Sequence, residues 1–151
     1  MAIAARYVHT NLVARDWRRL AAFYEQVLGC RPVPPERHLT EPWVERATGV
    51  PQGEIHGAHL RLPGLGEGGP TLEIFQYNAL AEGPVPAINR PGLGHLAFAV
   101  DDVRAALAAV EGAGGGRVGE LVEVEVPGAG RLAFVYATDP EGNILELQRW
   151  G

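Results

Sequence analysis

The chain contains no lysine, and its positive charge is carried entirely by arginines that form no cluster. Its 13 basic residues face 18 acidic ones, which leaves a formal net charge of −5 at pH 7 with the histidines neutral. Proteins that bind nucleic acid usually present a basic patch or stripe to the phosphate backbone. The composition therefore argues against a nucleic-acid-binding surface.

Long apolar segments are also missing. No run approaches the roughly 18–20 residues that a helix needs to cross a bilayer, and the apolar stretch over residues 1–5 is too short for a secretory signal. The single cysteine, Cys30, cannot form an internal disulfide and is expected to be a small core residue. These absences favour a protein of the reducing cytoplasm that makes no use of a membrane.

One pattern of elements occurs twice in the chain. A strand-like run over residues 5–14 leads to Asp16, a predicted N-cap, and then to apolar residues at helical spacing. In the second half, a strand-like run over residues 92–100 leads to a cap at Asp101 or Asp102 and to another amphipathic helix. The two halves therefore begin in the same way.

Three strand candidates follow each predicted helix, at residues 30–34, 55–62 and 71–77 and at residues 117–121, 131–138 and 144–150. The sequence thus predicts an α+β fold of two tandem βαβββ modules, forming a curved mixed sheet with a concave cleft. The expected boundaries are a first module over 1–81, a Pro/Gly-rich linker over 82–91 and a second module over 92–151.

The first module is the longer one, because it holds an insertion at about residues 35–53. Within it, residues 43–48 are expected to form an extra helical turn or two. Long loops often serve function, so this segment either covers a pocket or is a surface insertion with a packed Trp43.

Four potential metal ligands occupy matching places in the two halves: His9, Glu73, His95 and Glu146. Each histidine lies near the start of a strand-like run, and each glutamate lies near the end of another. Side chains alternate along a strand, so in each case the His or Glu points away from an apolar set suited to pack against a helix.

Two imidazoles and two carboxylates are a common ligand set for a catalytic divalent metal. A lone His or Glu on a strand usually has hydrogen-bond partners in the protein or faces solvent. Four such residues at matching places in the two halves favour metal ligation. A buried carboxylate is costly alone, and a shared dication offsets most of that cost. We therefore expect the cleft to be a concave metal-binding cleft with one divalent metal ion per site, drawn from Ni, Co, Zn, Fe or Mn.

Side chains on the same strand faces as these ligands are the expected substrate contacts: Asn11, Val13, His59, Arg61, Phe75, Tyr77 and Gln148. For His59 and Arg61 this holds if their common face is the concave one, and otherwise they are surface groups. His38 is expected to be solvated in a polar loop.

Several motifs carry a resemblance to a known family. They are VHTNL at residues 8–12, FYEQVLG at 23–29, LEI at 72–74, GHLAFAVDD at 94–102 and DPEGNILEL at 139–147. Together with the tandem βαβββ pattern, they resemble the vicinal oxygen chelate superfamily. That superfamily includes glyoxalase I, methylmalonyl-CoA epimerase, extradiol dioxygenases, and fosfomycin and bleomycin resistance proteins.

The resemblance implies that His9, Glu73, His95 and Glu146 are the metal ligands, a set most similar to that of glyoxalase I. It also implies a homodimer, with modules paired within a chain or across the dimer. The implied reaction is that of a lyase or isomerase, which abstracts a proton next to a metal-chelated carbonyl of a small substrate. Glu146 is the implied base, and Glu73 is the second candidate.

The resemblance does not extend to the glutathione-binding positions. Where bacterial glyoxalase I enzymes usually carry Arg and Asn, this chain has Val13 and Tyr77, which indicates a more apolar pocket. Two alternatives stay open. One is an Fe(II) ring-cleaving dioxygenase, and the other is a non-catalytic drug- or metabolite-binding resistance protein.

Overall fold

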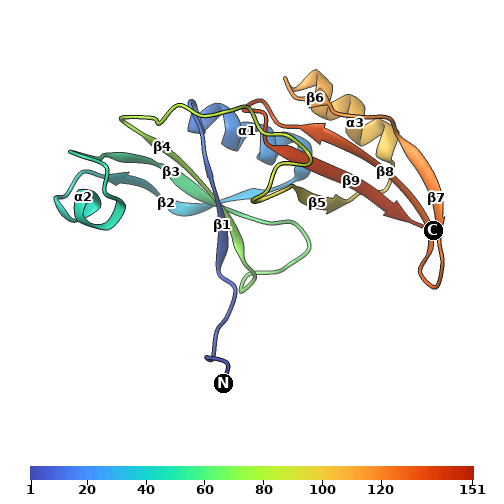
Figure 1. The fold of residues 1–151 in the computed structure, drawn as a ribbon, viewed down its shortest axis with the longest axis horizontal. Coiled ribbons are helices and arrows are strands. Elements are labelled where there is room, and N and C mark those ends of the chain that lie inside the picture. The colour runs from blue at the N-terminus through green and yellow to red at the C-terminus, as the bar shows by residue number, and fades with distance from the viewer. The chain divides into compact units, whose positions relative to one another are not determined.

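The computed structural model describes the whole chain, residues 1–151, and divides it into two units, 1–82 and 83–151. Each unit has its own mixed sheet and its own packed helix (Figure 1). No helix has the length and apolarity needed to cross a lipid bilayer.

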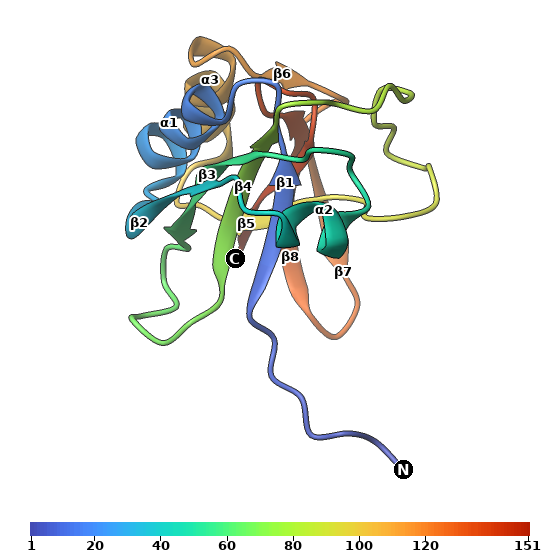
Figure 2. The same cartoon turned by 90° about the vertical axis from the view of Figure 1, so that its left-hand side faces the viewer.

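Unit 1 pairs its first strand with its last. Its strands run in the order β1-β4-β3-β2, with β1 parallel to β4 and the other pairs antiparallel. The elements are β1 (His9–Val13), α1 (Trp17–Leu28), β2 (Arg31–Leu39), α2 (Trp43–Thr48), β3 (Ile55–Arg61) and β4 (Thr71–Tyr77). The residues before β1 extend away from this sheet (Figure 2).

Unit 2 repeats this topology, but its fourth sheet position, the one that β2 holds in unit 1, is divided between two strands. Its path is β5-β9-β8-β6, β5 is parallel to β9, and β7 pairs with β8 beside β6. The elements are β5 (Leu96–Ala99), α3 (Val103–Gly112), β6 (Gly116–Arg117), β7 (Val122–Val126), β8 (Gly130–Thr138) and β9 (Ile144–Trp150). The predicted α+β class and its βαβββ-like modules are confirmed.

An aspartate begins the long helix of each unit. Asp16 accepts a hydrogen bond from the Arg19 backbone N–H at 3.0 Å, and Asp102 accepts one from the Ala105 N–H at the same distance. Each such cap stabilises a helix by about 0.5–2 kcal/mol. α1 ends at Gly29, whose φ of 71° lies in the left-handed region that glycine adopts without strain.

The apolar face of each helix covers one face of its own sheet. In unit 1, α1 buries Leu20, Phe23 and Tyr24 above Leu72 and Ile74 of β4, all at most 2% exposed. Strand alternation then sends Glu73 to the opposite face of the sheet.

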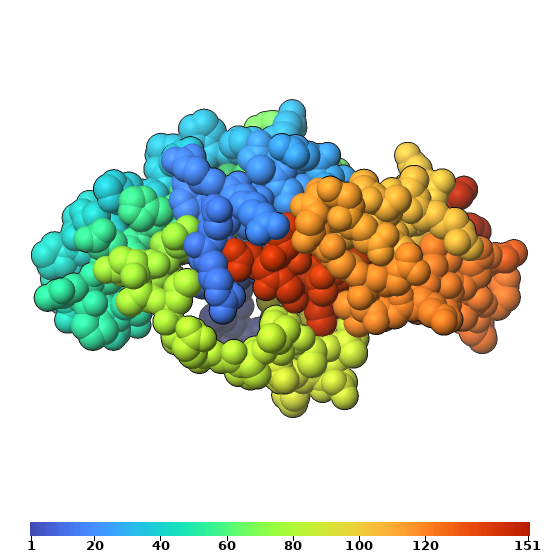
Figure 3. All heavy atoms as spheres, turned by 90° about the horizontal axis from the view of Figure 1, so that it is seen from above, coloured from blue at the N-terminus to red at the C-terminus, as the bar shows by residue number.

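In unit 2, α3 buries Leu107 and Val110 over β8 and β9, where Val135, Leu145 and Leu147 are fully buried. In Figure 3 the orange spheres of unit 2 lie directly against red spheres from nearer the C-terminus. Glu146 lies between the two leucines and faces the other way.

The structure corrects two strand predictions. β2 runs on to Leu39 rather than ending at residue 34, because it resumes pairing with β3 after an irregularity between Val33 and Arg37. His38 is therefore a strand residue, and its prediction as a loop residue was wrong. The predicted strand at 117–121 is confirmed only at its start, where Arg117 pairs with β8. Its remainder was wrong, because pairing to β8 breaks around Gly119 and resumes where valines alternate from residue 122.

The expected helical turns at 43–48 form as α2. The buried anchor of this helix is Val44, with no exposed surface, whereas Trp43 is 44% exposed. The alternative in which Trp43 is packed was therefore wrong.

A buried carboxylate shapes the turn that leads into β9. Asp139 is 2% exposed and accepts hydrogen bonds from the backbone N–H groups of Glu141 (2.9 Å) and Asn143 (3.0 Å) and from the Asn143 side chain (2.8 Å). This turn sets where β9 begins and so where Glu146 lies along the sheet.

Candidate metal centre

Three potential metal ligands of unit 1 converge on one sheet face: His9 from β1, His59 from β3 and Glu73 from β4. The Nε2 atoms of His9 and His59 lie 3.5 Å and 2.5 Å from the two carboxylate oxygens of Glu73. The two imidazole rings meet edge to face with their centroids 5.4 Å apart. One ligand atom from each side chain lies within 4.8 Å of those of the other two.

Strand register produces this convergence. His59 is the direct partner of Glu73 across the antiparallel pair β3–β4, so the two side chains emerge on the same face. On the other side of β4, Asn11 is the register partner of Glu73, and His9 lies two residues earlier with the same orientation. Glu73 thus lies on the strand between the two histidine-bearing strands.

The Glu73 carboxylate is held firmly, with only 8% of the residue exposed. Asn11 Nδ2 donates a hydrogen bond to Oε1 at 2.9 Å. The His59 ring is also oriented by Thr71, whose Oγ1 lies 2.8 Å from Nδ1. Burial lowers the pKa of His59 below its ordinary value, although the negative charge of Glu73 opposes the shift. A lowered pKa favours the neutral imidazole, which is the form that binds metals.

Unit 2 contains the corresponding His–Glu pair. His95 lies directly before β5, and its Nε2 atom is 2.9 Å from Oε2 of Glu146. The ring of Tyr136 contacts His95 with a centroid distance of 5.1 Å and an interplanar angle of 64°. Tyr136 is the register partner of Glu146 on β8.

We call His9, His59 and Glu73 half-site 1, and His95 and Glu146 half-site 2. The half-sites correspond strand by strand, since His59 and Tyr136 are each the antiparallel partner of their unit's glutamate. Half-site 1 therefore has an additional imidazole where half-site 2 has a phenol ring.

The donors of half-site 1 fit a divalent transition metal. Imidazole nitrogen and carboxylate oxygen are typical ligands of Zn, Ni, Co and Fe. Ligand atoms held about 2.0–2.2 Å from one ion lie roughly 3–4 Å from each other. The three donors of half-site 1 lie within 4.8 Å of one another, so a modest adjustment of the side chains would bring them to such distances.

The predicted contacts Val13, Phe75 and Tyr77 lie on the face that carries half-site 1. Val13 and Phe75 are register partners across β1–β4, and Val13 is 50% exposed. The Phe75 ring lies over Gly57, where an added Cβ would come within 2.7 Å of its Cδ1 atom. An apolar surface thus adjoins the candidate ligands.

Two other predicted contacts have local partners. Arg61 hydrogen-bonds the backbone carbonyls of Gly66 and Glu67 and pairs with the Glu67 carboxylate at 3.4 Å, which ties it to the β3–β4 loop. Gln148 lies two residues after the half-site 2 glutamate, and its Oε1 accepts a hydrogen bond from Trp150 Nε1 at 2.9 Å. Both side chains therefore have structural roles already.

Sequence reasoning missed Tyr136. The available signal was the alternation along β8, which places Tyr136 on the face opposite the buried Val135 and Ala137. Its equivalence to His59 was hidden, because the loops that join the last two strands differ in length between the units.

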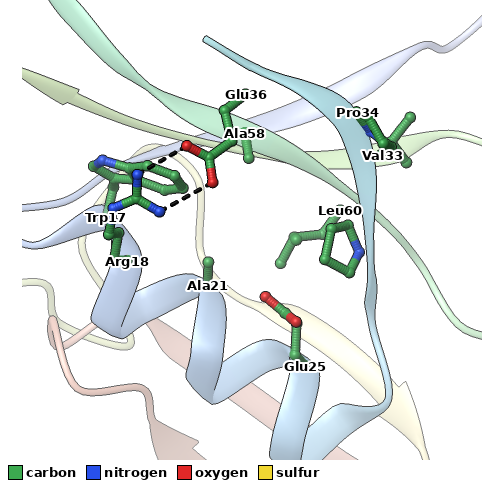
Figure 4. Close-up of a pocket in the computed structure, with 10 residues that line it drawn as sticks. Trp17, Arg18, Ala21, Glu25, Val33, Pro34, Glu36, Ala58 and Leu60 are labelled. Carbon is green, nitrogen blue, oxygen red and sulfur yellow. Dashed lines mark hydrogen bonds and ion pairs between the residues drawn. The ribbon is translucent and has the colours of Figure 1, made fainter. Parts of the chain in front are cut away.

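A separate cavity of about 280 Å³ lies on the helix side of unit 1, between α1, β2 and β3 (Figure 4). Ala58 and Leu60 form part of its wall, and the bidentate ion pair of Arg18 with Glu36 (2.8 and 3.0 Å) lies beside it. Ala58 and Leu60 alternate with His59, so this cavity opens on the sheet face opposite half-site 1.

Comparison with protein families identifies the fold's relatives. Residues 6–147 match the model of the Glyoxalase/Bleomycin resistance protein/Dioxygenase superfamily. The chain belongs to this superfamily. No curated protein matches it.

Solved structures of superfamily members share the fold at low identity. A glyoxalase family protein from Bacillus cereus matches with a TM-score of 0.81 and 20% identity, over 99% of this chain and 96% of that one. A glyoxalase/bleomycin resistance protein/dioxygenase family enzyme from Burkholderia phytofirmans PsJN matches at 0.61 and 16%, over 97% and 100% of the chains. A glyoxalase I variant from Zea mays matches at 0.61 and 22%, over 95% of this chain and 44% of that one. At these identities the likeness shows the fold, and the activity has to be argued from the site.

Proposed function

We propose that this protein is a divalent-metal-dependent lyase or isomerase of the glyoxalase I-like type, which removes a proton next to a carbonyl group of a small substrate. One observation supports the proposal most strongly. In each unit a histidine nitrogen at or directly before the start of the first strand lies close to a glutamate oxygen on the last strand. The distances are 3.5 Å for His9 and Glu73 and 2.9 Å for His95 and Glu146.

The proposed metal ligands are His9, Glu73, His95 and Glu146, so that the two half-sites together hold one ion. The half-sites would combine within one chain or across a homodimer. Neither half-site contains more than one carboxylate, and a joined set would bring two negative charges to one dication, which favours their burial. A bound ion would supply a positive charge that polarises a substrate carbonyl and so acidifies the neighbouring C–H group.

Glu146 is the proposed base. Glu73 has three contacts, with His9, His59 and Asn11, which together hold both of its oxygens. Glu146 has one such contact, with His95, which leaves its second oxygen free to accept a proton. A base needs this freedom to reach the substrate carbon, so the asymmetry supports Glu146 over Glu73.

The proposed substrate is small and has an apolar portion. Val13, Phe75 and Tyr77 would contact that portion, beside the ligands on the same sheet face. The side chains of Val13 and Tyr77 offer no cationic group to bind a glutathione carboxylate. We therefore do not propose that the substrate is a glutathione adduct.

A second candidate is an Fe(II) ring-cleaving dioxygenase, and half-site 1 favours it. His9, His59 and Glu73 form a set of two imidazoles and one carboxylate within one unit. Such a set leaves coordination positions open on Fe(II), as non-haem iron oxygenases require.

Metal analysis followed by an exchange assay tests the proposal. The purified protein is loaded with Ni²⁺, Co²⁺, Zn²⁺, Fe²⁺ or Mn²⁺ and incubated in D₂O with 2-oxoaldehyde–thiol adducts or acyl-CoAs, and the loss of the α-proton signal is followed by NMR. Glu146→Gln should keep the fold and most of the metal affinity but abolish exchange. Glu120→Gln, at an exposed site, serves as the matched control.

Unchanged exchange in Glu146→Gln would remove Glu146 as the base. Stoichiometric O₂ uptake with Fe²⁺ and a catechol would instead identify the dioxygenase. Failure to bind any divalent ion would leave the non-catalytic binding protein as the conclusion.

A further inference from the structure

Unit 1 has a second group of metal-ligating side chains, at the edge of its sheet. His38 of β2 and His56 of β3 are register partners, and their rings stack with centroids 4.1 Å apart and planes 25° from parallel. Glu54, directly before β3, brings a carboxylate to the same place. One ligand atom from each of the three lies within 4.8 Å of those of the other two.

This group is separate from half-site 1. His56 and His59 are three residues apart on one strand, so their side chains emerge on opposite faces of the sheet. His56 shares its face with Ala58 and Leu60, which lie on the helix side and are at most 5% exposed. No residue of half-site 1 can therefore contribute to the group.

The backbone around Glu54 is fixed by Asn78. The Asn78 side-chain oxygen accepts a hydrogen bond from the Glu54 N–H at 2.9 Å, and the Asn78 N–H donates to the Glu54 carbonyl at 3.1 Å. The Asn78 amide also donates to the Gln52 carbonyl at 2.9 Å. The start of β3 is thus held in place while the Glu54 carboxylate stays exposed to solvent.

The surroundings of Glu54 are acidic. A hollow of about 270 Å³ beside it is lined by two further carboxylate residues, Glu41 and Glu45, and by no basic residue. These glutamates accept hydrogen bonds from the backbone N–H groups of Thr40 and Gln52, so they add negative charge near the group without belonging to it. Negative charge raises the local concentration of cations.

We propose that His38, Glu54 and His56 form a second metal site, which binds a divalent transition ion such as Zn²⁺, Cu²⁺, Ni²⁺ or Co²⁺. Two imidazoles and a carboxylate suit this class of ion better than Mg²⁺ or Ca²⁺, which prefer oxygen ligands alone. The ion links edge strand β2 to β3, beyond the irregularity in their pairing, and water completes its coordination. The site therefore stabilises the edge of unit 1 rather than taking part in the proposed reaction.

The experiment isolates this site by removing the ligands of half-site 1. In the background His9→Ala/His59→Ala/Glu73→Gln, isothermal titration with Zn²⁺ is expected to show one equivalent bound per chain. Adding His38→Ala is expected to weaken that binding at least tenfold and to abolish the Zn²⁺-dependent rise in the melting temperature, because an ion stabilises only the state it binds. The matched control is Glu41→Gln, which should leave one equivalent bound.

Ligand identity is tested with Cu²⁺ by electron paramagnetic resonance. The background protein should show coupling to two imidazole nitrogens, and His38→Ala should reduce this to one. His38 is exposed on an edge strand, so its replacement is compatible with folding, which circular dichroism checks. If the background binds no Zn²⁺, or if His38→Ala binds as the background does, the site does not exist. Neither result depends on whether the half-sites bind a catalytic ion.

Discussion

The hydrogen bond from Asn11 Nδ2 to Glu73 Oε1, 2.9 Å long, holds one oxygen of the candidate ligand in half-site 1. A hydrogen bond to a charged acceptor contributes about 1.5–3 kcal/mol, and partners that orient metal ligands alter metal affinity by about 10–100-fold. The free energy of the hydrogen bond and the change in affinity agree, because a tenfold change in Kd corresponds to about 1.4 kcal/mol. We expect Asn11→Ala to weaken metal binding by about 10–100-fold without changing its stoichiometry.

Isothermal titration calorimetry with Ni²⁺ at a single pH measures this change. The titration is done in a His56→Ala background, so that the β2–β3 site does not contribute heat. Asn89→Ala, at an exposed position between β4 and β5, is the matched control and should bind as the background does. The unfolding free energy of each variant should be measured in parallel, to separate lost affinity from lost folding.

A Kd within twofold of the background value would refute the reasoning. It would mean that the Glu73 carboxylate needs no orientation by Asn11, or that it does not bind the ion. A large loss of affinity in Asn89→Ala would equally undermine the interpretation, because that residue lies outside both sheets.

In the same His56→Ala background, His95→Ala should lose the ion at the proposed centre and the metal-dependent rise in melting temperature, as measured by metal analysis and scanning fluorimetry. Asp139→Ala removes the acceptor of three hydrogen bonds in a buried turn, and should lower the unfolding free energy by about 2–4 kcal/mol and Tm by about 4–16 °C in a calorimetric scan. Burial raises the pKa of Cys30 to about 11. At pH 8 only about 0.1% of it is thiolate, against about a quarter for a free thiol, so iodoacetamide should alkylate the native protein at least about 100-fold more slowly than the urea-unfolded protein.

Each of these three predictions would be contradicted by a specific result. An unchanged metal content in His95→Ala would contradict its assignment as a ligand. Asp101→Ala, at an exposed site without a capping role, should leave Tm nearly unchanged, and an equal loss in both aspartate variants would contradict the turn argument. Rapid alkylation of native Cys30 would mean that its surroundings open readily.

Much of the fold follows from local patterns. Helical spacing and an aspartate cap predict α1 and α3, because both signals act within a few residues. The alternation around Glu73 and Glu146 predicts that both carboxylates turn away from the helices, since each is flanked by side chains that need burial. The break between β6 and β7 was not predictable in this way, because it depends on how a neighbouring strand pairs.

The sequence by itself determined the βαβββ pattern of each unit and the orientation of His9, Glu73 and Glu146, because backbone periodicity assigns each side chain to a face. Only the tertiary structure decided which residues on a face are neighbours, since register between strands distant in sequence depends on the packing of the whole sheet. Register paired His59 with Glu73, and it stacked His38 on His56. Both histidine clusters of unit 1 are therefore products of strand pairing, which no local pattern in the chain records.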